Sequence, residues 1–396
     1  MIRIMFVDDD VNLLEAMQRT MRPMRHEWSM EFVSCGSEAL ERLAKTPADV
    51  IVTDMCMPGM DGWQLLGEVK TLYPQTVRLV LSGHADPGAI MRLVGTAHQY
   101  IAKPGETATL KAAIAQTQLL KRLLSSERLA ALVGSVGTLP SCPKAYQEIS
   151  TCLRQPNASA SDAARIIGRD AAMTANLMKL VNSAFFGSRR PISSVERALA
   201  YLGLDTVAAL ALGHSLFQNG GSSRPGGVNL ESLWQHSLRT AMAARAIALV
   251  EKLPTARVEE AFLTGMLHDI GRVVYATRSH LTPGESASSN EDTVEQVNRH
   301  HAEVGAYLLG LWGFPNPIVQ AVAFHHAPSQ AGGEGLCLPR LIHIADQMVH
   351  QRRAPASPDP GRGELEPNLQ EGLGMEARWP AWIAQLDLLD AQGCPT

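Results

Sequence analysis

The sequence predicts an α/β domain with a doubly wound, five-stranded parallel sheet, followed by an all-α domain. Over residues 1–120, short apolar runs alternate with amphipathic stretches, as expected of a parallel sheet with helices on both faces. Beyond residue 133 this pattern gives way to helical periods that Gly and Pro interrupt. The length of 396 residues exceeds what one ordinary core fills, so two or more domains are expected.

The first domain, residues 1–120, contains five apolar runs that predict its strands. Each run is short enough to be buried on both faces of a sheet. The runs cover residues 2–7, 30–33, 50–53, 77–81 and 100–102. After Pro104, residues 106–124 place Leu110, Ile114 and Leu120 near helical spacing. This stretch predicts a last helix that continues into a linker helix at residues 121–133.

The second half carries sequence signals for helix starts and for loops. Ser159 with Asp162, and Ser193 with Glu196, have the spacing of a capping box. A Gly/Ser/Pro-rich loop near residues 218–228 divides the predicted helical domain, residues 134–350, into two subdomains. Residues 351–396 predict a flexible Pro/Gly-rich tail with a terminal helix at 379–389.

Composition argues against several classes of protein. A net charge of -4 gives no general attraction to nucleic acid, and no basic recognition helix is evident, so no direct DNA binding is expected. The N-terminus lacks the regions of a signal peptide, and no apolar run is long enough to span a membrane. The six cysteines lack CxxC spacing, as reduced intracellular thiols usually do. We therefore expect a cytoplasmic protein without membrane insertion.

Acidic side chains follow the first and third predicted strands. Asp8 and Asp9 end the first and Asp54 ends the third, at the carboxyl ends where functional groups collect in parallel sheets. Carboxylates about 4 Å apart repel by roughly 4 kcal/mol at an effective dielectric near 20, so the cluster calls for a cation, and Mg2+ suits it. Ser82 and Lys103 end the next two strands. This combination suits phosphoryl transfer to Asp54.

Residues 1–120 resemble the response-regulator receiver family, which has a flavodoxin-like fold. The resemblance rests on the motifs FVDDD, VIVTDMCMPGMDG, LVLSG and QYIAKP, which stand in the family's order and spacing. It implies that Asp54 is the phosphoacceptor and that a sensor histidine kinase is the donor. It also implies that Asp8, Asp9, Asp54 and the main-chain carbonyl of Cys56 hold Mg2+.

The same resemblance assigns three further roles near the phosphoacceptor. Ser82 matches the switch hydroxyl, Lys103 the phosphate-binding lysine, and Tyr100 the aromatic residue that turns inward when Ser82 follows the phosphoryl group. The last strand and helix would then change their contacts. Because that helix leads into the helical domain, the altered face could release, expose or dimerise it.

Histidines gather in the second half of the chain. Nine of the thirteen lie at or beyond residue 236, several of them in apolar helical stretches near aspartates. Imidazoles and a bridging carboxylate are the ligands of hydrolytic sites with one or two metal ions. The alternative is that buried histidines satisfy one another and backbone carbonyls. The candidate ligands of a divalent transition metal are His236, His268, Asp269, His301, His325, His326 and Asp346.

Residues 139–326 resemble the HDOD family, a divergent branch of the HD hydrolase superfamily. The resemblance rests on LPSCPKAYQEI, RIIGRDAAMTANLMKLVNSAFFG, SSVERALAYLGLDTV, LWQHS, HDIG and HAEVGAYLLGLWGFP. It implies a non-catalytic output that acts on a downstream signalling protein. The alternative is a metal-dependent phosphodiesterase similar to the HD-GYP branch, which hydrolyses cyclic dinucleotides. Against it, the GYP loop is missing, and Arg272 replaces the lysine usual after HDIG in that branch.

Overall fold

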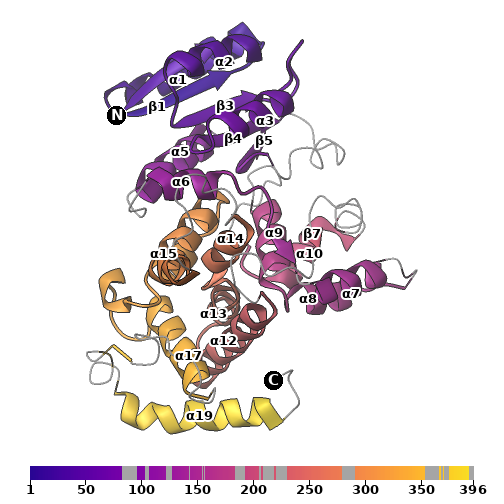
Figure 1. Ribbon diagram of the computed structural model, residues 1–396, viewed down its shortest axis with the longest axis vertical. Helices are drawn as coiled ribbons and strands as arrows, with labels where there is room; N and C mark the ends of the chain where they lie inside the picture. The colour runs from indigo at the N-terminus through magenta and orange to yellow at the C-terminus, as the bar shows by residue number, and fades with distance from the viewer. Residues whose placement is uncertain are drawn as a thin grey trace.

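The first part of the chain is a parallel sheet between two layers of helices (Figure 1). The computed structural model describes residues 1–396 except 83–95, 103–106, 122–126, 142, 154, 156, 183–191, 205–206, 208–217, 220–229, 279–289, 353–364, 367–368, 370–373 and 392–396. The sheet has the order β2-β1-β3-β4-β5. Its strands are β1 (Ile2–Val7), β2 (Trp28–Val33), β3 (Val50–Asp54), β4 (Val77–Ser82) and β5 (Gln99–Ala102). The predicted α/β fold class is confirmed.

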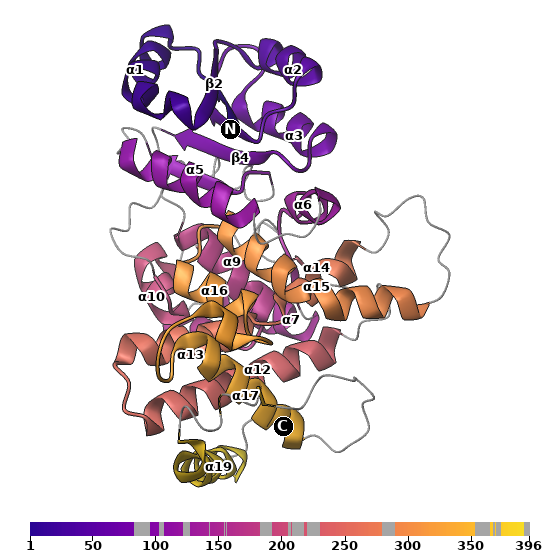
Figure 2. The ribbon, with the colours of Figure 1, turned by 90° about the vertical axis from the view of Figure 1, so that its left-hand side faces the viewer.

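Successive side chains of a strand point to opposite faces of the sheet and pack into two separate layers of the core. Ile4 and Phe6 of β1 point to one face and pack in a cluster with residues of α1 (Val11–Met21) and α5 (Thr107–Lys121). Met5 and Val7 point to the other face, toward α2 (Gly36–Lys45) and α3 (Gly62–Leu72). This alternation follows from the period of two in a strand. Figure 2 shows α1 and α2 on opposite sides of the sheet.

The rest of the described chain is almost entirely helical, as the sequence predicts. A two-residue parallel pair, β6 (Pro140–Ser141) with β7 (Gln218–Asn219), is the exception among the described residues. The helices are α6 (Glu127–Gly134), α7 (Pro143–Leu153), α8 (Ala160–Ile167), α9 (Ala171–Val181), α10 (Val195–Leu202), α12 (Leu230–Val250), α13 (Thr255–Leu267), α14 (Ile270–Arg278), α15 (Asn290–Leu311), α16 (Asn316–Ala323), α17 (Leu338–Arg352) and α19 (Met375–Ala391).

Capping side chains fix where two of these helices begin. Ser159 accepts a hydrogen bond from the backbone N–H of Asp162 at the start of α8, as its spacing predicts. The predicted cap at Ser193 is wrong by one residue, because Ser194 is the N-cap of α10 and accepts from the N–H of Arg197. Two adjacent serines make the choice ambiguous in the sequence, and only the extended backbone of Ser194 decides it.

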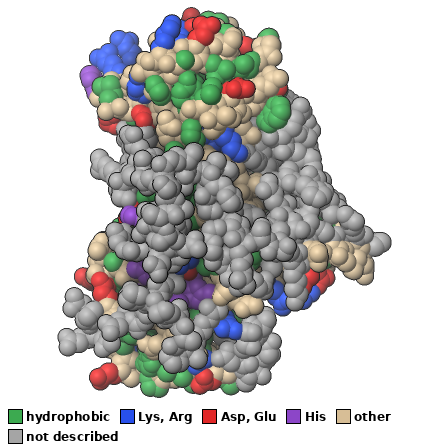
Figure 3. Space-filling view, in the orientation of Figure 1, with side chains coloured by type: hydrophobic (Ala, Val, Ile, Leu, Met, Phe, Trp, Pro, Cys, Tyr) green, Lys and Arg blue, Asp and Glu red, His purple; other side chains and the backbone are tan. Residues whose placement is uncertain are grey.

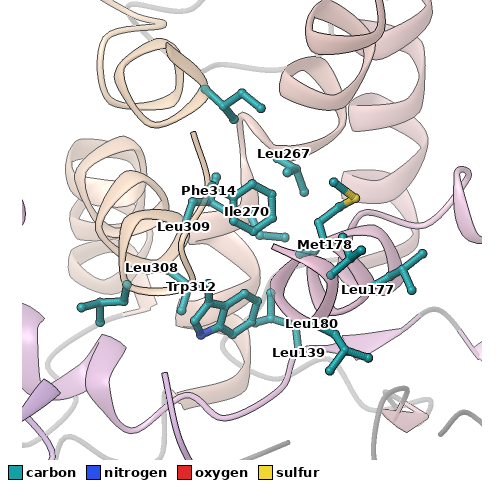
Figure 4. Packing of buried hydrophobic residues seen from close by; sticks show 14 of the residues in the cluster. Leu139, Leu177, Met178, Leu180, Leu267, Ile270, Leu308, Leu309, Trp312 and Phe314 are labelled. Carbon is teal, nitrogen blue, oxygen red and sulfur yellow. The ribbon is translucent and has the colours of Figure 1, made fainter. Parts of the chain in front are cut away.

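The two parts of the chain share a hydrophobic core. Leu120 of α5 packs so closely on Gly310 of α15 that a Cβ at residue 310 would lie 2.2 Å from its side chain. Beyond α15, Trp312 and Phe314 pack with Met178 and Leu180 of α9 (Figure 4). Figure 1 shows α5 and α6 between the sheet and the other helices, with α19 at the far end. The helical part is therefore docked directly on the sheet domain.

Buried basic side chains line this junction. The guanidinium of Arg78 in β4 is fully buried and donates to the carbonyl oxygens of Thr96 and Gly134 at 2.7 and 2.5 Å. His98 lies beside it, and burial lowers the pKa of its imidazole well below the usual value. Lys179 donates to the carbonyl of Gly137 at 2.8 Å. Main-chain carbonyls of the linker segment thus bind Arg78 of the first domain and Lys179 of the helical part.

None of the described helices combines the length and the apolar character needed to cross a bilayer.

Candidate functional site

The first candidate site lies at the carboxyl edge of the parallel sheet. Asp8 follows β1 directly, and Asp54 ends the neighbouring strand β3; both side chains are almost fully buried, whereas Asp9 is exposed. Asp8 accepts a hydrogen bond from the N–H of Asp10 at 3.0 Å, and Asp54 accepts from the N–H of Cys56 at 3.1 Å. Because the donors at this edge are carboxylate oxygens, it fits a hard ion such as Mg2+.

The close approach of α3 shapes the loop after Asp54. A Cβ at Gly62 would lie 2.1 Å from the carbonyl oxygen of Asp54, so only glycine lets α3 begin against the end of β3. The N–H of Gly62 donates to the carbonyl of Met55 at 3.0 Å and closes the loop. Asp61 caps α3 with a full capping box through Gln64. The loop that follows the phosphoacceptor candidate Asp54 is therefore conformationally constrained.

Of the three residues predicted near the phosphoacceptor, the structure describes the backbone of Ser82 and the whole of Tyr100. Ser82 ends β4, the strand next to Asp54, and pairs in register with Ala102 of β5. Tyr100 of β5 is buried, and this burial raises the pKa of its hydroxyl. Lys103 lies outside the described residues. The sheet order thus brings Asp8, Asp54 and Ser82 to the ends of three successive strands.

The second candidate site is a cluster of histidines and aspartates between the helices. All seven predicted residues come together there, although they are spread over 111 positions of the chain. They come from α12, the α13–α14 junction, α15, the turn after α16, and α17. Six of the seven are buried and His326 is exposed. Figure 3 shows histidine side chains reaching the surface of the helical part.

Asp269 lies close to several histidines of the cluster. Its Oδ1 lies 3.1 Å from Nε2 of His301, and its Oδ2 lies 3.7 Å from Nε2 of His268 and 3.9 Å from Nε2 of His236. Asp346 lies opposite, with its Oδ1 at 3.0 Å from Nε2 of His236. One carboxylate therefore faces two groups of imidazoles, as a bridging ligand does.

One glycine contact and two backbone carbonyls hold this geometry. A Cβ at Gly271 would lie 2.0 Å from the carbonyl oxygen of His301, so the glycine lets α14 and α15 approach closely enough for His301 to reach Asp269. Nδ1 of His268 lies 2.8 Å from the carbonyl of Gly265, and Nδ1 of His325 lies 2.7 Å from that of Val322. Backbone partners of this kind orient metal-binding histidines and leave Nε2 for the metal.

His350 belongs to the same cluster, and the sequence analysis missed it. Its Nε2 lies 3.3 Å from Oδ1 of Asp346, which is one turn earlier on α17. Together with His236 these residues form a group that could hold a metal ion. The i, i+4 spacing of Asp346 and His350 within a helical pattern was the available signal.

The charges of the centre compensate one another. Burial lowers the pKa of His268, but Asp269 and Asp346 outweigh it and raise the pKa to about 9. Burial likewise opposes the charge on Asp269, but Arg272 and the histidines hold its pKa well below the usual value. Nitrogen and carboxylate donors in this number suit a divalent transition metal, so the residues present fit such an ion.

Comparison with known proteins assigns both halves of the chain. Residues 4–115 match the response regulator receiver domain, and residues 139–328 match the HDOD domain. An uncharacterized protein of Treponema pallidum is 26% identical over 233 residues, which are 56% of this chain and 44% of that protein. The hydrogenase transcriptional regulatory protein HoxA of Cupriavidus necator is 37% identical over 103 residues, 26% of this chain and 21% of that protein.

Among solved structures, the MmoQ response regulator of Methylococcus capsulatus is 25% identical, with a TM-score of 0.46, and the match covers 62% of this chain and 98% of that one. The chain spans less than half the length of the curated relatives named above. The order of the two matched domains agrees with the order of the sheet and the helical part. The chain therefore belongs to the response regulators, with a receiver domain joined to an HDOD output domain.

Proposed function

We propose that Asp54 accepts a phosphoryl group from a sensor histidine kinase and that this modification controls the HDOD domain. The observation that carries the proposal is the position of Asp54 at the end of β3. This strand lies between β1, which Asp8 follows, and β4, which ends in Ser82. A nucleophilic carboxylate flanked by a second acid and a hydroxyl has the parts that phosphoryl transfer needs.

Each residue at this edge has a distinct role in the proposed reaction. Asp8, Asp9, Asp54 and the carbonyl of Cys56 would hold Mg2+, which supplies positive charge to the phosphoryl oxygens. A carboxylate oxygen of Asp54 attacks phosphorus in line as the bond to the kinase histidine breaks. The hydroxyl of Ser82 then donates to a phosphoryl oxygen, and the side chain of Tyr100 follows the movement of β4.

The contacts between the domains support a short route to the output. The side-chain amide of Gln99, the first residue of β5, donates to the carbonyl of Leu311 at the end of α15, at 3.0 Å. Leu120 of α5 packs on Gly310 in the same turn. A change in β4, β5 and α5 therefore acts directly on α15. The output that we propose is altered binding of a downstream signalling protein.

Phosphorylation with acetyl phosphate and Mg2+ tests this proposal. We expect one phosphoryl group per chain by intact mass, and none in Asp54→Asn. The matched control is Asp49→Asn, because Asp49 precedes the same strand at the opposite edge and accepts from the N–H of Arg3, which an asparagine oxygen also does. Equal labelling of Asp54→Asn and the unaltered chain would contradict the proposal, as would no labelling of either.

A second function is favoured by the convergence of the histidines and aspartates. We propose that this centre binds a divalent transition metal, and a metal-dependent phosphodiesterase acting on a cyclic dinucleotide is the activity that such a centre would support. A bound ion supplies Lewis-acid chemistry. The residues of the chain orient it: Gly265 and Val322 fix the histidine rings, and the exposed edge at His326 admits a ligand.

Metal content and turnover test the second function separately. We expect His301→Gln to lower the metal content of the purified chain, whereas His300→Gln does not, because His300 pairs with Glu303 and belongs to none of the metal-binding groups. Turnover of cyclic di-GMP that is lost in Asp269→Ala would establish the enzyme. Metal binding without turnover would leave a non-catalytic metal centre, and equal metal content in both histidine variants would contradict the centre itself.

A further inference from the structure

The turn after α16 carries His326, the exposed member of the histidine–aspartate centre. It leads into a short 3-10 helix, η3 (Pro328–Ala331). The N–H of Gln330 donates to the carbonyl of Ala327 at 3.0 Å, but a helix of this length has too few internal hydrogen bonds to be stable alone. The position of the turn therefore depends on its contacts with other segments.

Two glycines between η3 and α17 give the turn a hinge. Gly332 and Gly333 have φ values of 70° and 88°, which residues with a Cβ rarely adopt. A Cβ at Gly332 would meet no described atom within 4 Å, so packing does not restrain the backbone at this point. Hinges of moving loops are a few residues of this kind, which absorb a change in backbone angles.

One residue of the C-terminal segment, Glu366, binds both sides of the turn. Its carboxylate accepts from the N–H of Ser329 at 3.1 Å and from the hydroxyl of the same serine. Its own N–H donates to Nε2 of His343 at 3.2 Å, and Nδ1 of that buried histidine donates to the carbonyl of His325 at 2.8 Å. The two residues that are tied in this way, His325 and Ser329, flank His326.

The segment that contains Glu366 is anchored on the core of the helical part. Leu369 is almost fully buried in a hydrophobic cluster with residues of α12 and α17, and Leu365 packs against the same cluster. In α19, the indole N–H of the fully buried Trp382 donates to Glu251 at the end of α12, at 3.0 Å. The match to the HDOD domain ends at residue 328, so this anchor lies beyond the matched region. A fixed segment thus holds a turn that has a hinge of its own.

We propose that residues 325–331 form a lid over the exposed edge of the histidine–aspartate centre and that Glu366 is the latch that holds it. While Glu366 keeps its hydrogen bonds, the lid holds Nε2 of His326 at 2.9 Å from Nε2 of the buried His301. When these bonds break, the lid swings about the glycine hinge, His326 leaves His301, and the edge opens to solvent and to a ligand. The latch concerns access to the centre and is independent of whether the centre binds an ion.

Hydrogen exchange in the full-length chain tests the latch. Glu366→Ala removes the carboxylate that binds Ser329. We expect the N–H groups of Ala327 and Gln330, which donate to carbonyls within the turn, to exchange roughly tenfold faster, because a hydrogen bond to a charged group is worth about that factor in an opening equilibrium. Fragmentation mass spectrometry resolves the single residues. Diethyl pyrocarbonate should also modify the imidazole of His326 faster by a similar factor.

The matched control is Glu334→Ala, because Glu334 is an exposed acid in the loop that follows η3, and both rates should stay unchanged. Ser329→Ala removes the hydroxyl from the other side of the contact and should raise the rates less, because the N–H of residue 329 still donates to Glu366. Since Ser329 is exposed, this variant decides the question if Glu366→Ala does not fold. Faster exchange at residue 329 alone, unchanged rates in the rest of the lid, or an equal change in Glu334→Ala would overturn the proposal.

Discussion

The two edges of the receiver sheet differ in charge and in exposure. The carboxyl edge carries the acids Asp8, Asp9 and Asp54, of which Asp9 is open to solvent. The amino edge carries Arg78 and His98, which are completely covered. An acidic edge at the surface can bind a cation and a phosphoryl group. At the basic edge, the side chain of Arg78 is already hydrogen-bonded to carbonyl oxygens of the chain. The proposed phosphorylation site and the contacts with the helical part therefore lie at opposite edges of one sheet.

Strands β4 and β5 connect these edges over a short distance. β4 carries Arg78 near its start and Ser82 at its end, and β5 carries Gln99 and Ala102 in the same way. Four residues of strand span about 13 Å. A shift at Ser82 thus has a direct covalent path to the residues that contact Gly134 and Leu311. The difference between the edges suggests that the junction, and not the acidic edge, supplies most of the stability.

Replacing the buried cation should have the largest effect on the amino edge. Arg78→Met leaves the carbonyl of Thr96 without its donor in a buried site and leaves the carbonyl of Gly134 with the longer contact to Nε2 of His98, at 3.3 Å. Each lost partner costs about 1–3 kcal/mol. We expect the free energy of unfolding to fall by about 3 kcal/mol or more in urea titrations. Arg42→Met is the control, because Arg42 is an exposed partner of Glu38 and its loss should cost less than about 1 kcal/mol. Equal costs would contradict a stabilising role for the buried guanidinium.

A smaller effect is expected where the linker helix meets the receiver. A Cβ at Gly134 would lie 1.9 Å from the carbonyl oxygen of Pro74, so Gly134→Ala must push α6 away from the amino edge. Overpacking of this kind costs typically 1–3 kcal/mol, and we expect a loss of about 2 kcal/mol. Gly67→Ala provides the contrast: nothing lies within 4 Å of its Cβ position in α3, so helix propensity should stabilise that variant by about 0.5–1 kcal/mol. A neutral Gly134→Ala would mean that α6 does not press on the sheet.

The acidic edge could be predicted from the sequence and the basic edge could not. Asp8 and Asp54 follow apolar runs, and the order of parallel strands brings them to one edge, so a local pattern carries the information. Arg78 is the one charged residue in the run VRLVLS, and its partners include the main-chain carbonyls of residues 96 and 134. Every residue has such a carbonyl, so no side-chain pattern identifies these partners.

The histidine–aspartate centre could also be predicted only in part from the sequence. The motif HDIG and the separate histidines predicted its members, because imidazoles and carboxylates in apolar helices are unusual enough to stand out. The contact between Arg272 and Asp269 depends on which carboxylate oxygen faces α14, and this depends on the packing of Gly271 against α15. The sequence therefore predicts which residues belong to the centre, whereas the packing of the helices determines how these residues divide into two groups.

The smallest effect concerns the titration of His98 at the amino edge. Burial, together with the charges of Arg78 and Lys179, keeps the pKa of His98 well below its ordinary value of 6.5. The unfolded chain therefore takes up a proton near pH 6.5 that the folded chain does not, so stability falls as the pH falls. This imidazole should account for about 1.3 kcal/mol of the loss between pH 7.0 and 5.5. His98→Asn keeps an acceptor for the N–H of Arg78 and should reduce the loss by that amount in urea titrations at pH 7.0 and 5.5.

The exposed His26 provides the comparison, because His26→Asn should leave the pH dependence unchanged. An unchanged slope in His98→Asn would contradict a contribution of this buried imidazole to the acid sensitivity of the chain.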